Sequence, residues 1–400
     1  MTEDNKAFCA APWVHLFGFG DDKIYPCCKS SQPVGSVKEQ SLKEIWNSDD
    51  IKKLRVNMLQ GIKTSSCEVC YLNEARWGDS YRLTFNKRYQ DILQNEITNT
   101  SADGTVDKFN LRYLDLRFSN LCNFKCIMCS GFYSTSWYKE EKQLKREGVL
   151  QEIADTKKER NFFYLMRDEL PDVLRTVEKI NFAGGEPFIV KEYLEVLDEL
   201  IKQNKTDTEI TFNTNLSILP DAYVEKLKKF TKITIRASLD GYGAKGEFIR
   251  KGLIWKKFIA NRIQLSKELP HADIRIYCTV QVLNVYHVLE LYKMLISASV
   301  IPQSPNKFHI SFVETPDYYN IRTLDKNTKQ LITNFYNNNL INYPDKIKNY
   351  LSRVIIYMNE TDIDKSVDFK KITNELDGLR NQKTREIFPE LTSYFDHINL

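Results

Sequence analysis

The sequence predicts an α/β protein whose centre is an open, partial (β/α)6 barrel of the TIM-like kind, preceded by a cysteine-rich module and followed by a helical extension. Strand-like and helix-like segments alternate between residues 111 and 314, and eight of the nine cysteines come before residue 130. Residues 315–400 show helical periodicity without a ligand-type cluster. Alternation of this kind requires helical crossovers between parallel strands, and six units suit an open barrel better than the closed eight-stranded form.

The six predicted strands are rich in β-branched residues and apolar on both faces, as a parallel sheet covered by helices requires. They are residues 113–118, 178–184, 209–214, 232–239, 273–284 and 307–314. The predicted helices that connect them are 131–175, 191–204, 221–230, 245–267 and 285–298. In such a sheet the chemistry collects where strands end, so the loops after the strands are the candidate site.

The first hundred residues contain short irregular pieces and one predicted helix, "SLKEIWNSDDIKKLRVNMLQG" (41–61). Ser41 and Glu44 form a capping box at its start, and Gly61 is a plausible C-cap. Residues 95–110 have the composition of a linker. We therefore predict domains at 1–100, 111–314 and 315–400, the last packing on the barrel as a helical extension, with a lid or a partner surface as the alternative.

Composition sets the broad class of the protein. The chain is 42% hydrophobic and 28% charged, which is typical of a globular protein. A net charge of +4 falls short of the footprint of a dedicated nucleic-acid binder. We find no basic-then-apolar start and no apolar run of about 18 residues, so we expect a cytoplasmic protein with no membrane partner. In a reducing compartment, clustered cysteines are more often metal ligands or catalytic groups than disulfides.

The segment "CNFKCIMC" places Cys122, Cys126 and Cys129 on the loop after the first barrel strand. Thiolate-only ligation favours zinc or an iron–sulfur cluster. A structural zinc site needs a fourth protein ligand, and no other histidine or cysteine lies near this triplet in the sequence. A cubic four-iron cluster can use three cysteines and leave one iron open to a small molecule. The triplet therefore indicates a [4Fe–4S] cluster with an open iron.

The triplet, followed one βα unit later by "GGEP" (184–187), resembles the motifs of the radical S-adenosylmethionine (SAM) superfamily. The resemblance covers about residues 111–314. It implies that the open iron binds the amino and carboxylate groups of SAM. One electron then cleaves the sulfur–C5′ bond, and the resulting 5′-deoxyadenosyl radical abstracts hydrogen from a substrate carbon.

The resemblance also implies SAM contacts on the loops that follow the strands. Gly184 and Gly185 would let their backbone approach the methionine amino group. "TNL" (214–216) stands where relatives often carry TNG. A guanidinium at Arg250 suits the SAM carboxylate, but an exposed helix residue is an equal alternative. No catalytic residue is assigned, and the implied SAM-binding set is Met128, Gly184, Gly185, Glu186, Asn215, Ser238, Arg250 and Leu283.

A second cysteine group precedes the barrel. Cys67 and Cys70, with Cys9 and Cys27, could supply four thiolates, and Cys28 competes with Cys27. Alone, this pattern most often indicates structural zinc. Beside the triplet it resembles the twitch and SPASM domains, although in many relatives that module follows the barrel. The resemblance implies one auxiliary [4Fe–4S] cluster, either fully ligated or with an open iron for substrate.

These patterns favour a radical SAM enzyme acting on a peptide, a protein or a small molecule, with an electron donor such as flavodoxin or ferredoxin. Two alternatives remain: the same chemistry on RNA, which the composition does not indicate, and a non-catalytic iron–sulfur or zinc protein. We expect Cys278 to be a buried hydrophobic residue. In "GDSYRLTFNKRY" (78–89), Arg82 and Arg88 belong to a solvated helix face or else meet an anionic substrate.

Overall fold

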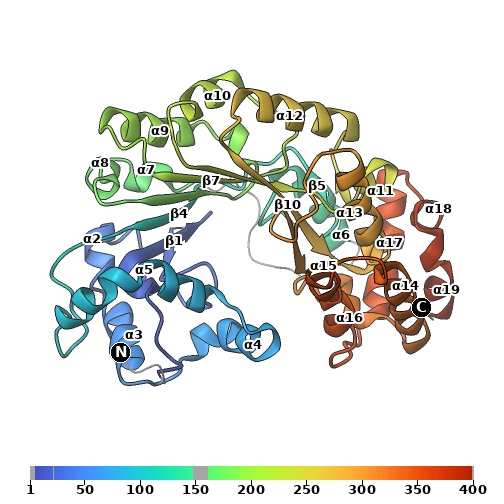
Figure 1. Ribbon diagram of the computed structural model, residues 1–400, viewed down its shortest axis with the longest axis horizontal. Coiled ribbons are helices and arrows are strands. Elements are labelled where there is room, and N and C mark those ends of the chain that lie inside the picture. The colour runs from blue at the N-terminus through green and yellow to red at the C-terminus, as the bar shows by residue number, and fades with distance from the viewer. Residues whose placement is uncertain (1–4, 21, 147–160, 399–400) are drawn as a thin grey trace. The chain divides into compact units, whose positions relative to one another are not determined.

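A computed structural model describes residues 5–20, 22–146 and 161–398 of the chain (Figure 1). The chain divides into two compact units that interleave along the sequence. The first contains Met1–Asn120, Glu159–Phe212 and Glu225–Ile233. The second contains Leu121–Lys158, Asn213–Val224 and Thr234–Leu400. No helix in the described ranges is both long enough and apolar enough to cross a membrane.

The first unit is built on a sheet whose strands run in the order β3-β2-β1-β4-β6-β7. Strands β1, β4, β6 and β7 are parallel to one another, and β2 and β3 are antiparallel additions at the edge. The bounds are β1 His15–Phe19, β2 Lys23–Tyr25, β3 Gly35–Ser36, β4 Tyr113–Arg117, β6 Lys179–Phe182 and β7 Glu209–Thr214, whose last two residues belong to the second unit. The cysteine-rich module thus contributes β1 directly to the barrel sheet, which the sequence did not predict.

The first hundred residues contain more helix than the single one predicted, because residues 11–14, 68–77 and 81–98 are also helical. The helix expected over residues 41–61 is two helices, because Ser48 forms a second N-cap by accepting the Ile51 N–H. The capping box at Ser41 is present as predicted. The expected linker begins only after Thr98, where α5 ends. The bounds are α1 Ala11–Val14, α2 Leu42–Ile45, α3 Asp49–Leu59, η1 Ser65–Cys67, α4 Glu68–Trp77, α5 Tyr81–Thr98, α7 Phe163–Met166, α8 Leu170–Leu174, η3 Pro187–Ile189 and α9 Glu192–Lys202.

The second unit carries the parallel strands β8, β10 and β11, in that order. Buried residues alternate with partly exposed ones along all three strands. One face therefore packs under helices, whereas the other carries polar residues such as Arg236 and Arg275. Our expectation of two apolar faces was wrong for these strands. The bounds are β8 Ile233–Ser238, β10 Asp273–Val280, β11 Phe308–Phe312 and, in a separate antiparallel ribbon, β5 Lys125–Cys126 and β9 Arg250–Lys251.

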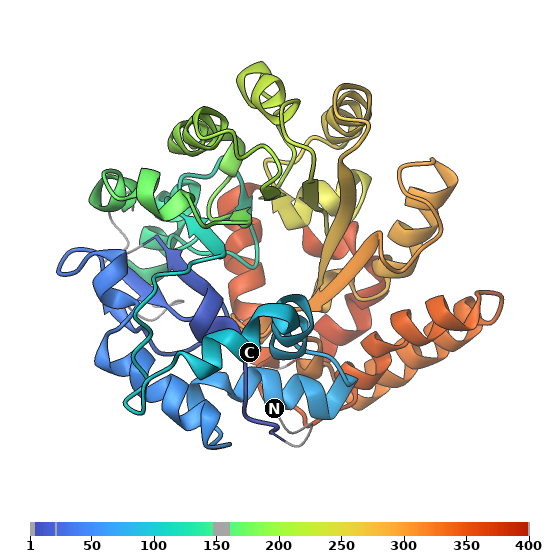
Figure 2. The ribbon, with the colours of Figure 1, turned by 60° about the vertical axis from the view of Figure 1, so that its left-hand side comes forward.

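Helices of the second unit include the expected C-terminal extension, drawn in orange and red in Figures 1 and 2. The helix predicted over residues 245–267 is divided by β9 into α11 and α12. Residues 147–160 of the predicted helical region 131–175 lie outside the described residues. The bounds are η2 Thr135–Trp137, α6 Tyr138–Arg146, α10 Asp221–Leu227 (which crosses between the units), α11 Gly243–Ile249, α12 Trp255–Glu268, η4 Val282–Asn284, α13 His287–Ser297, η5 Asp317–Tyr319, η6 Ile321–Thr323, α14 Lys326–Leu340, α15 Asp345–Leu351, α16 Arg353–Met358, α17 Ser366–Arg380, α18 Thr384–Ile387, η7 Pro389–Leu391 and α19 Thr392–His397.

The architecture is a mixed α/β fold with a mostly parallel sheet, consistent with the predicted partial TIM-like barrel. The six predicted barrel strands are present as β4, β6, β7, β8, β10 and β11. The domain boundaries at residues 100, 111 and 314 stay predictions.

Candidate active site

The cysteine triplet occupies the loop after β4 and belongs to the second unit. Cys126 is buried in β5 and lies opposite Arg250 of β9. A hydrogen bond from the Cys129 thiol lowers the pKa of Cys126; burial opposes this effect, and the positive charges of Arg250 and Arg380 add to it. The Phe124 N–H also donates to Cys122 Sγ, at 3.5 Å. The positive charges favour the thiolate of Cys126, whereas the hydrogen bond with Cys126 and burial raise the pKa of Cys129.

Side chains fix the carbonyl groups of this loop. Trp137 Nε1 donates to the Cys126 carbonyl at 2.9 Å, and the Ser136 hydroxyl donates to the Cys122 carbonyl at 2.6 Å. Gly252, beside β9, has φ +116°, and a Cβ there would lie 2.6 Å from the Phe124 ring. Only glycine permits this approach of the β9 turn to the cysteine loop.

Arg250 is buried between a carboxylate and a cysteine. Its Nε lies 2.7 Å from Asp240 Oδ2, and its Nη1 donates to Cys126 Sγ at 3.8 Å. Its side chain is only 11% exposed, so the alternative of an exposed helix residue was wrong. Asp240 is fully buried and also accepts the Thr279 N–H at 2.7 Å. The guanidinium of Arg250 thus lies beside the Cys126 sulfur, and its contact with SAM stays a prediction.

The glycine-rich motif lies in the first unit, after β6. Gly184 and Gly185 have φ of +84° and +51°. A Cβ on Gly184 would lie 2.9 Å from Arg117 Cβ and 3.0 Å from the Ser119 carbonyl oxygen. Gly184 is therefore required by the end of the chain's own strand β4, a reason that the sequence alone did not give. The buried Glu186 accepts the Phe188 N–H at 3.1 Å and caps η3.

Asn215 is joined to the cysteine loop within the second unit. Its Nδ2 donates to Asn123 Oδ1, and its Oδ1 accepts the Ser217 N–H, both at 2.9 Å. The next residue, Leu216, has φ +52°. Leu216 thus adopts the left-handed backbone conformation that the glycine of a TNG sequence adopts readily.

The remaining predicted SAM contacts lie at strand ends or in the cysteine loop. Ser238 ends β8, Leu283 is buried in η4, and Met128 is partly buried beside Cys129. Sequence reasoning missed Asn284, whose Nδ2 donates to the carbonyls of Asp240 and Thr279, both at 3.0 Å. Its only signal was its place after "VQVL", at the end of a predicted strand.

The second cysteine group gathers in the first unit. Cys9 and Cys70 are buried, and Cys27 and Cys67 pack against the apolar cluster that contains Cys9. Burial raises the pKa of Cys9, with Cys67 and Cys70 adding to the effect. Burial also raises the pKa of Cys27, with contributions from Cys28, Cys9 and Cys67. Electrostatic effects on their pKa values thus link Cys9 with Cys27, Cys67 and Cys70.

Cys28 faces a different neighbour, Arg117 at the end of β4. Burial lowers the pKa of Arg117, but Asp115 and Cys28 outweigh it, so the pKa is raised. Cys27 is thus influenced by Cys28 as well as by Cys9 and Cys67, and Cys28 also acts on the Arg117 guanidinium.

A local hydrogen bond recurs at the cysteines. The Ala11 N–H donates to Cys9 Sγ at 3.5 Å, the Lys29 backbone bonds to Cys27, and Phe124 bonds to Cys122 in the same way. N–H···S bonds orient thiolates and tune iron–sulfur centres. Among the described residues no three His, Cys, Asp or Glu side chains already form a metal-binding group, so the fit rests on the donor chemistry.

The helix α5 leaves Arg88 exposed, as expected for a solvated face, but buries Arg82. Arg82 is buried, and its Nε and Nη1 donate to Glu74 Oε1 and the Phe8 carbonyl, each at 2.8 Å. Arg88 forms an ion pair with Glu209 at 2.9 Å. The solvated-face interpretation was therefore wrong for Arg82, whose guanidinium is committed to internal partners. Cys278 is buried as expected.

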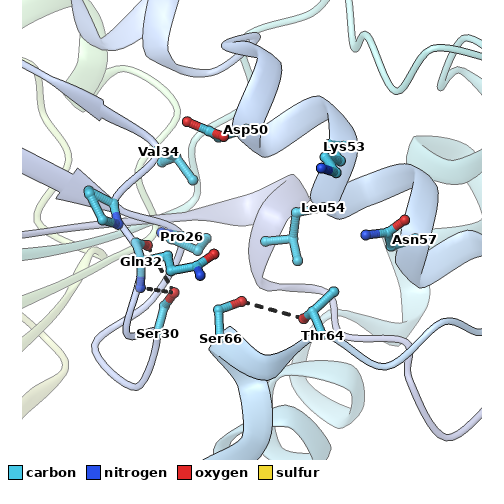
Figure 3. Close-up of a pocket in the computed structure, with 11 residues that line it drawn as sticks. Pro26, Ser30, Gln32, Val34, Asp50, Lys53, Leu54, Asn57, Thr64 and Ser66 are labelled. Atoms are coloured by element: carbon cyan, nitrogen blue, oxygen red, sulfur yellow. Dashed lines mark hydrogen bonds between the residues drawn. The ribbon is translucent and has the colours of Figure 1, made fainter.

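A pocket of about 140 Å³ lies in the first unit, on the loops that lead into Cys27 and Cys67 (Figure 3). The Ser30 hydroxyl donates a hydrogen bond to the Gln32 carbonyl, and the Ser66 hydroxyl donates to the Thr64 hydroxyl at 3.4 Å. Ligand pockets for cofactor-sized molecules are usually about 300 Å³ or more. No predicted site residue lines this pocket, and we assign it no ligand.

Comparison with known proteins matches both cysteine regions. Residues 116–288 match the Radical SAM superfamily, and residues 9–71 match SPASM, an iron-sulfur cluster-binding domain. A GTP 3′,8-cyclase of Nautilia profundicola is 28% identical over 160 residues, which cover 40% of this chain and 43% of that protein. A GTP 3′,8-cyclase of a Sulfurovum species is 29% identical over 128 residues, covering 32% and 34%. The matches thus span less than half the length of these curated relatives.

Among solved structures, anSMEcpe with bound AdoMet and the Cp18Cys peptide is 19% identical, covering 56% of this chain and 58% of that one, with a TM-score of 0.39. Streptococcus suis SuiB bound to S-adenosylmethionine is 13% identical, covering 73% and 62%, with a TM-score of 0.36. The matched families imply a SAM-binding [4Fe–4S] cluster and auxiliary iron–sulfur binding. The chain therefore carries an N-terminal SPASM iron–sulfur domain followed by a domain of the radical SAM superfamily.

Proposed function

We propose that the protein is a radical SAM enzyme in which Cys122, Cys126 and Cys129 hold the SAM-binding [4Fe–4S] cluster. When bound, the cluster and SAM supply a 5′-deoxyadenosyl radical that abstracts hydrogen from a peptide, protein or small-molecule substrate. The single observation that carries this proposal is the triplet loop itself: three cysteines, a guanidinium at 3.8 Å from Cys126 and carbonyls fixed by neighbouring side chains.

The chain's own residues position and shield the reaction. Arg250, held by Asp240, keeps a positive charge beside Cys126. Gly184 and Gly185 have positive φ and no side chain, so their backbone is accessible for the proposed contact with the SAM amino group. Asn215 joins the loop after β7 to the cysteine loop. Met128, Glu186, Ser238 and Leu283 stay proposed SAM contacts on the basis of motif position.

The auxiliary cluster is proposed on Cys9, Cys27, Cys67 and Cys70. Cys9 and Cys67 act on Cys27, and Cys28 acts on the Arg117 guanidinium, so we propose Cys27 as the ligand with Cys28 as the alternate. A fully ligated cluster would transfer electrons or stabilise the domain, whereas an open iron would bind substrate. We propose a cytoplasmic location and an electron donor of the flavodoxin or ferredoxin type.

A second candidate is a nucleotide substrate. The curated relatives are named GTP 3′,8-cyclase, and Arg236 of β8 lies directly beside Arg275 of β10. Two neighbouring guanidinium groups suit phosphate oxygens. The protein is incubated with SAM and either GTP or a peptide library, and the products are analysed. A modified nucleotide or a modified peptide then identifies the substrate class.

The first experiment is anaerobic reconstitution followed by measurement of iron, zinc and reductively formed 5′-deoxyadenosine. We expect about eight irons per chain, from two four-iron clusters. Cys126→Ala should lose about four irons and all 5′-deoxyadenosine, and the control Cys278→Ala should keep both. About one zinc per chain with no 5′-deoxyadenosine would overturn the proposal and leave a structural metal protein.

A further inference from the structure

The last residue of α17, Arg380, reaches from the C-terminal extension into the cysteine loop of the same unit. Its side chain is only 1% exposed. Nε and Nη2 donate to Glu140 Oε2 at 3.1 and 2.8 Å, and Nη2 also donates to the Lys125 carbonyl at 3.0 Å. The guanidinium carbon lies 4.9 Å from the centre of the Trp137 ring.

Each of these contacts joins Arg380 to Lys125 or to a group that is hydrogen-bonded to Lys125 or Cys126. Lys125 precedes Cys126 in the chain, and the Trp137 indole donates to the Cys126 carbonyl at 2.9 Å. Glu140 also accepts a hydrogen bond from Lys125 Nζ. Arg380 therefore touches the backbone before Cys126 and the indole ring that holds the Cys126 carbonyl.

One nitrogen of this guanidinium has a donor to spare. Nη1 of Arg380 is buried and has no hydrogen-bond partner among the described residues. Leaving a buried charged donor unpaired costs the full desolvation penalty of that group. A sulfur acceptor at the cluster position would satisfy it, because cluster sulfides and thiolates accept N–H hydrogen bonds.

We infer that Arg380 is a positioning residue for the SAM-binding cluster: it fixes the cysteine loop and donates a charged hydrogen bond to a cluster sulfur. The inference rests on the proposed function, since it requires the cluster. A positive donor next to an iron–sulfur centre favours the reduced, more negative form, so Arg380 should raise the reduction potential. The C-terminal extension would thus complete the cluster site.

The test compares Arg380→Gln and Arg380→Lys in reconstituted full-length protein, with Arg385→Gln as the matched control. Arg385 is 47% exposed and pairs with Asp396 on the surface. Iron content, the electron paramagnetic resonance spectrum of the reduced cluster and its midpoint potential are measured. A single-cluster background, obtained with Cys67→Ala/Cys70→Ala, assigns the signal to the triplet.

We expect Arg380→Gln to lower the equilibrium constant for reduction of the cluster about tenfold. This corresponds to a midpoint potential lower by ~59 mV for one electron. Arg380→Lys, which keeps the charge, should recover most of the potential, and the control should match the parent. An unchanged potential in Arg380→Gln would overturn the inference, as would equal shifts in Gln and Lys variants. If Arg380→Gln takes up no cluster, the midpoint potential of Arg380→Lys is compared with that of the parent protein. A parent protein that takes up no iron–sulfur cluster would instead refute the proposed function.

Discussion

Leu216 offers a sharp test of how the chain stabilises the loop after β7. The residue has φ +52° and is completely buried. Its N–H donates to Thr214 Oγ1, and its carbonyl accepts from Asn261 Nδ2, both at 2.9 Å, so the backbone is held on both sides. A left-handed conformation costs a residue with a Cβ about 1–2 kcal/mol. Burial of the leucine must offset that strain.

Leu216→Ala and Leu216→Gly separate these two effects. Both variants lose the buried side chain, at a cost of about 2–5 kcal/mol. Alanine keeps the strain, whereas glycine relieves about 1–2 kcal/mol of it and adds about 0.5–1 kcal/mol of unfolded-chain entropy. The glycine variant should therefore be more stable than the alanine variant by about 0.5–1 kcal/mol, and both should be less stable than the parent.

Urea unfolding followed by circular dichroism gives the three free energies. Leu239→Ala and Leu239→Gly are the matched controls, because Leu239 is equally buried and does not have a positive φ. There the order should reverse, with alanine the more stable. Alanine more stable than glycine at both positions would refute the argument that residue 216 carries backbone strain.

Three further outcomes are expected. Burial lowers the pKa of His15 to about 4 from 6.5, so the unfolded chain binds a proton first as pH falls. Stability should therefore drop by about 3 kcal/mol from pH 6.5 to 4, and His15→Gln should flatten this slope in urea titrations. Cys27→Ser should lose about four irons, whereas Cys28→Ser should keep them. Equal losses in the two variants would contradict the choice of Cys27 as the ligand. Gly184→Ala should destabilise the protein by about 1–3 kcal/mol and lower its thermal midpoint, because the added Cβ would clash with Arg117. An unchanged thermal midpoint would show that strand β4 shifts to make room for the methyl group.

Local chemistry was readable from the sequence, and long-range pairing was not. The capping box at Ser41 depends on residues three apart and is present as predicted. The break at Ser48 was missed because helical periodicity continues across it. Arg250 could not be placed, since it meets Cys126 only through a two-residue ribbon with no propensity of its own, and Asp240 reaches it from the segment after β8.

The same limit explains what was missed at the cluster loop. The triplet motif identified the three cysteines but not Arg380, whose partner Glu140 is 240 positions away. The Leu216 backbone could be expected from its place in a TNG-like sequence, but not the burial that holds it. Motifs record which atoms bind a cofactor, whereas the residues that hold those atoms still depend on packing.

The parallel pairing of β1 with β4 has a consequence for synthesis of the chain. His15 and Tyr113, which lie opposite each other in this pair, are 98 residues apart. At about 5–20 residues per second, a ribosome needs roughly 5–20 s to make the second strand after the first. During that interval the edge of β1 that later binds β4 has no strand beside it. An early-formed auxiliary metal site on Cys9, Cys27, Cys67 and Cys70 would keep this strand in place until the barrel begins.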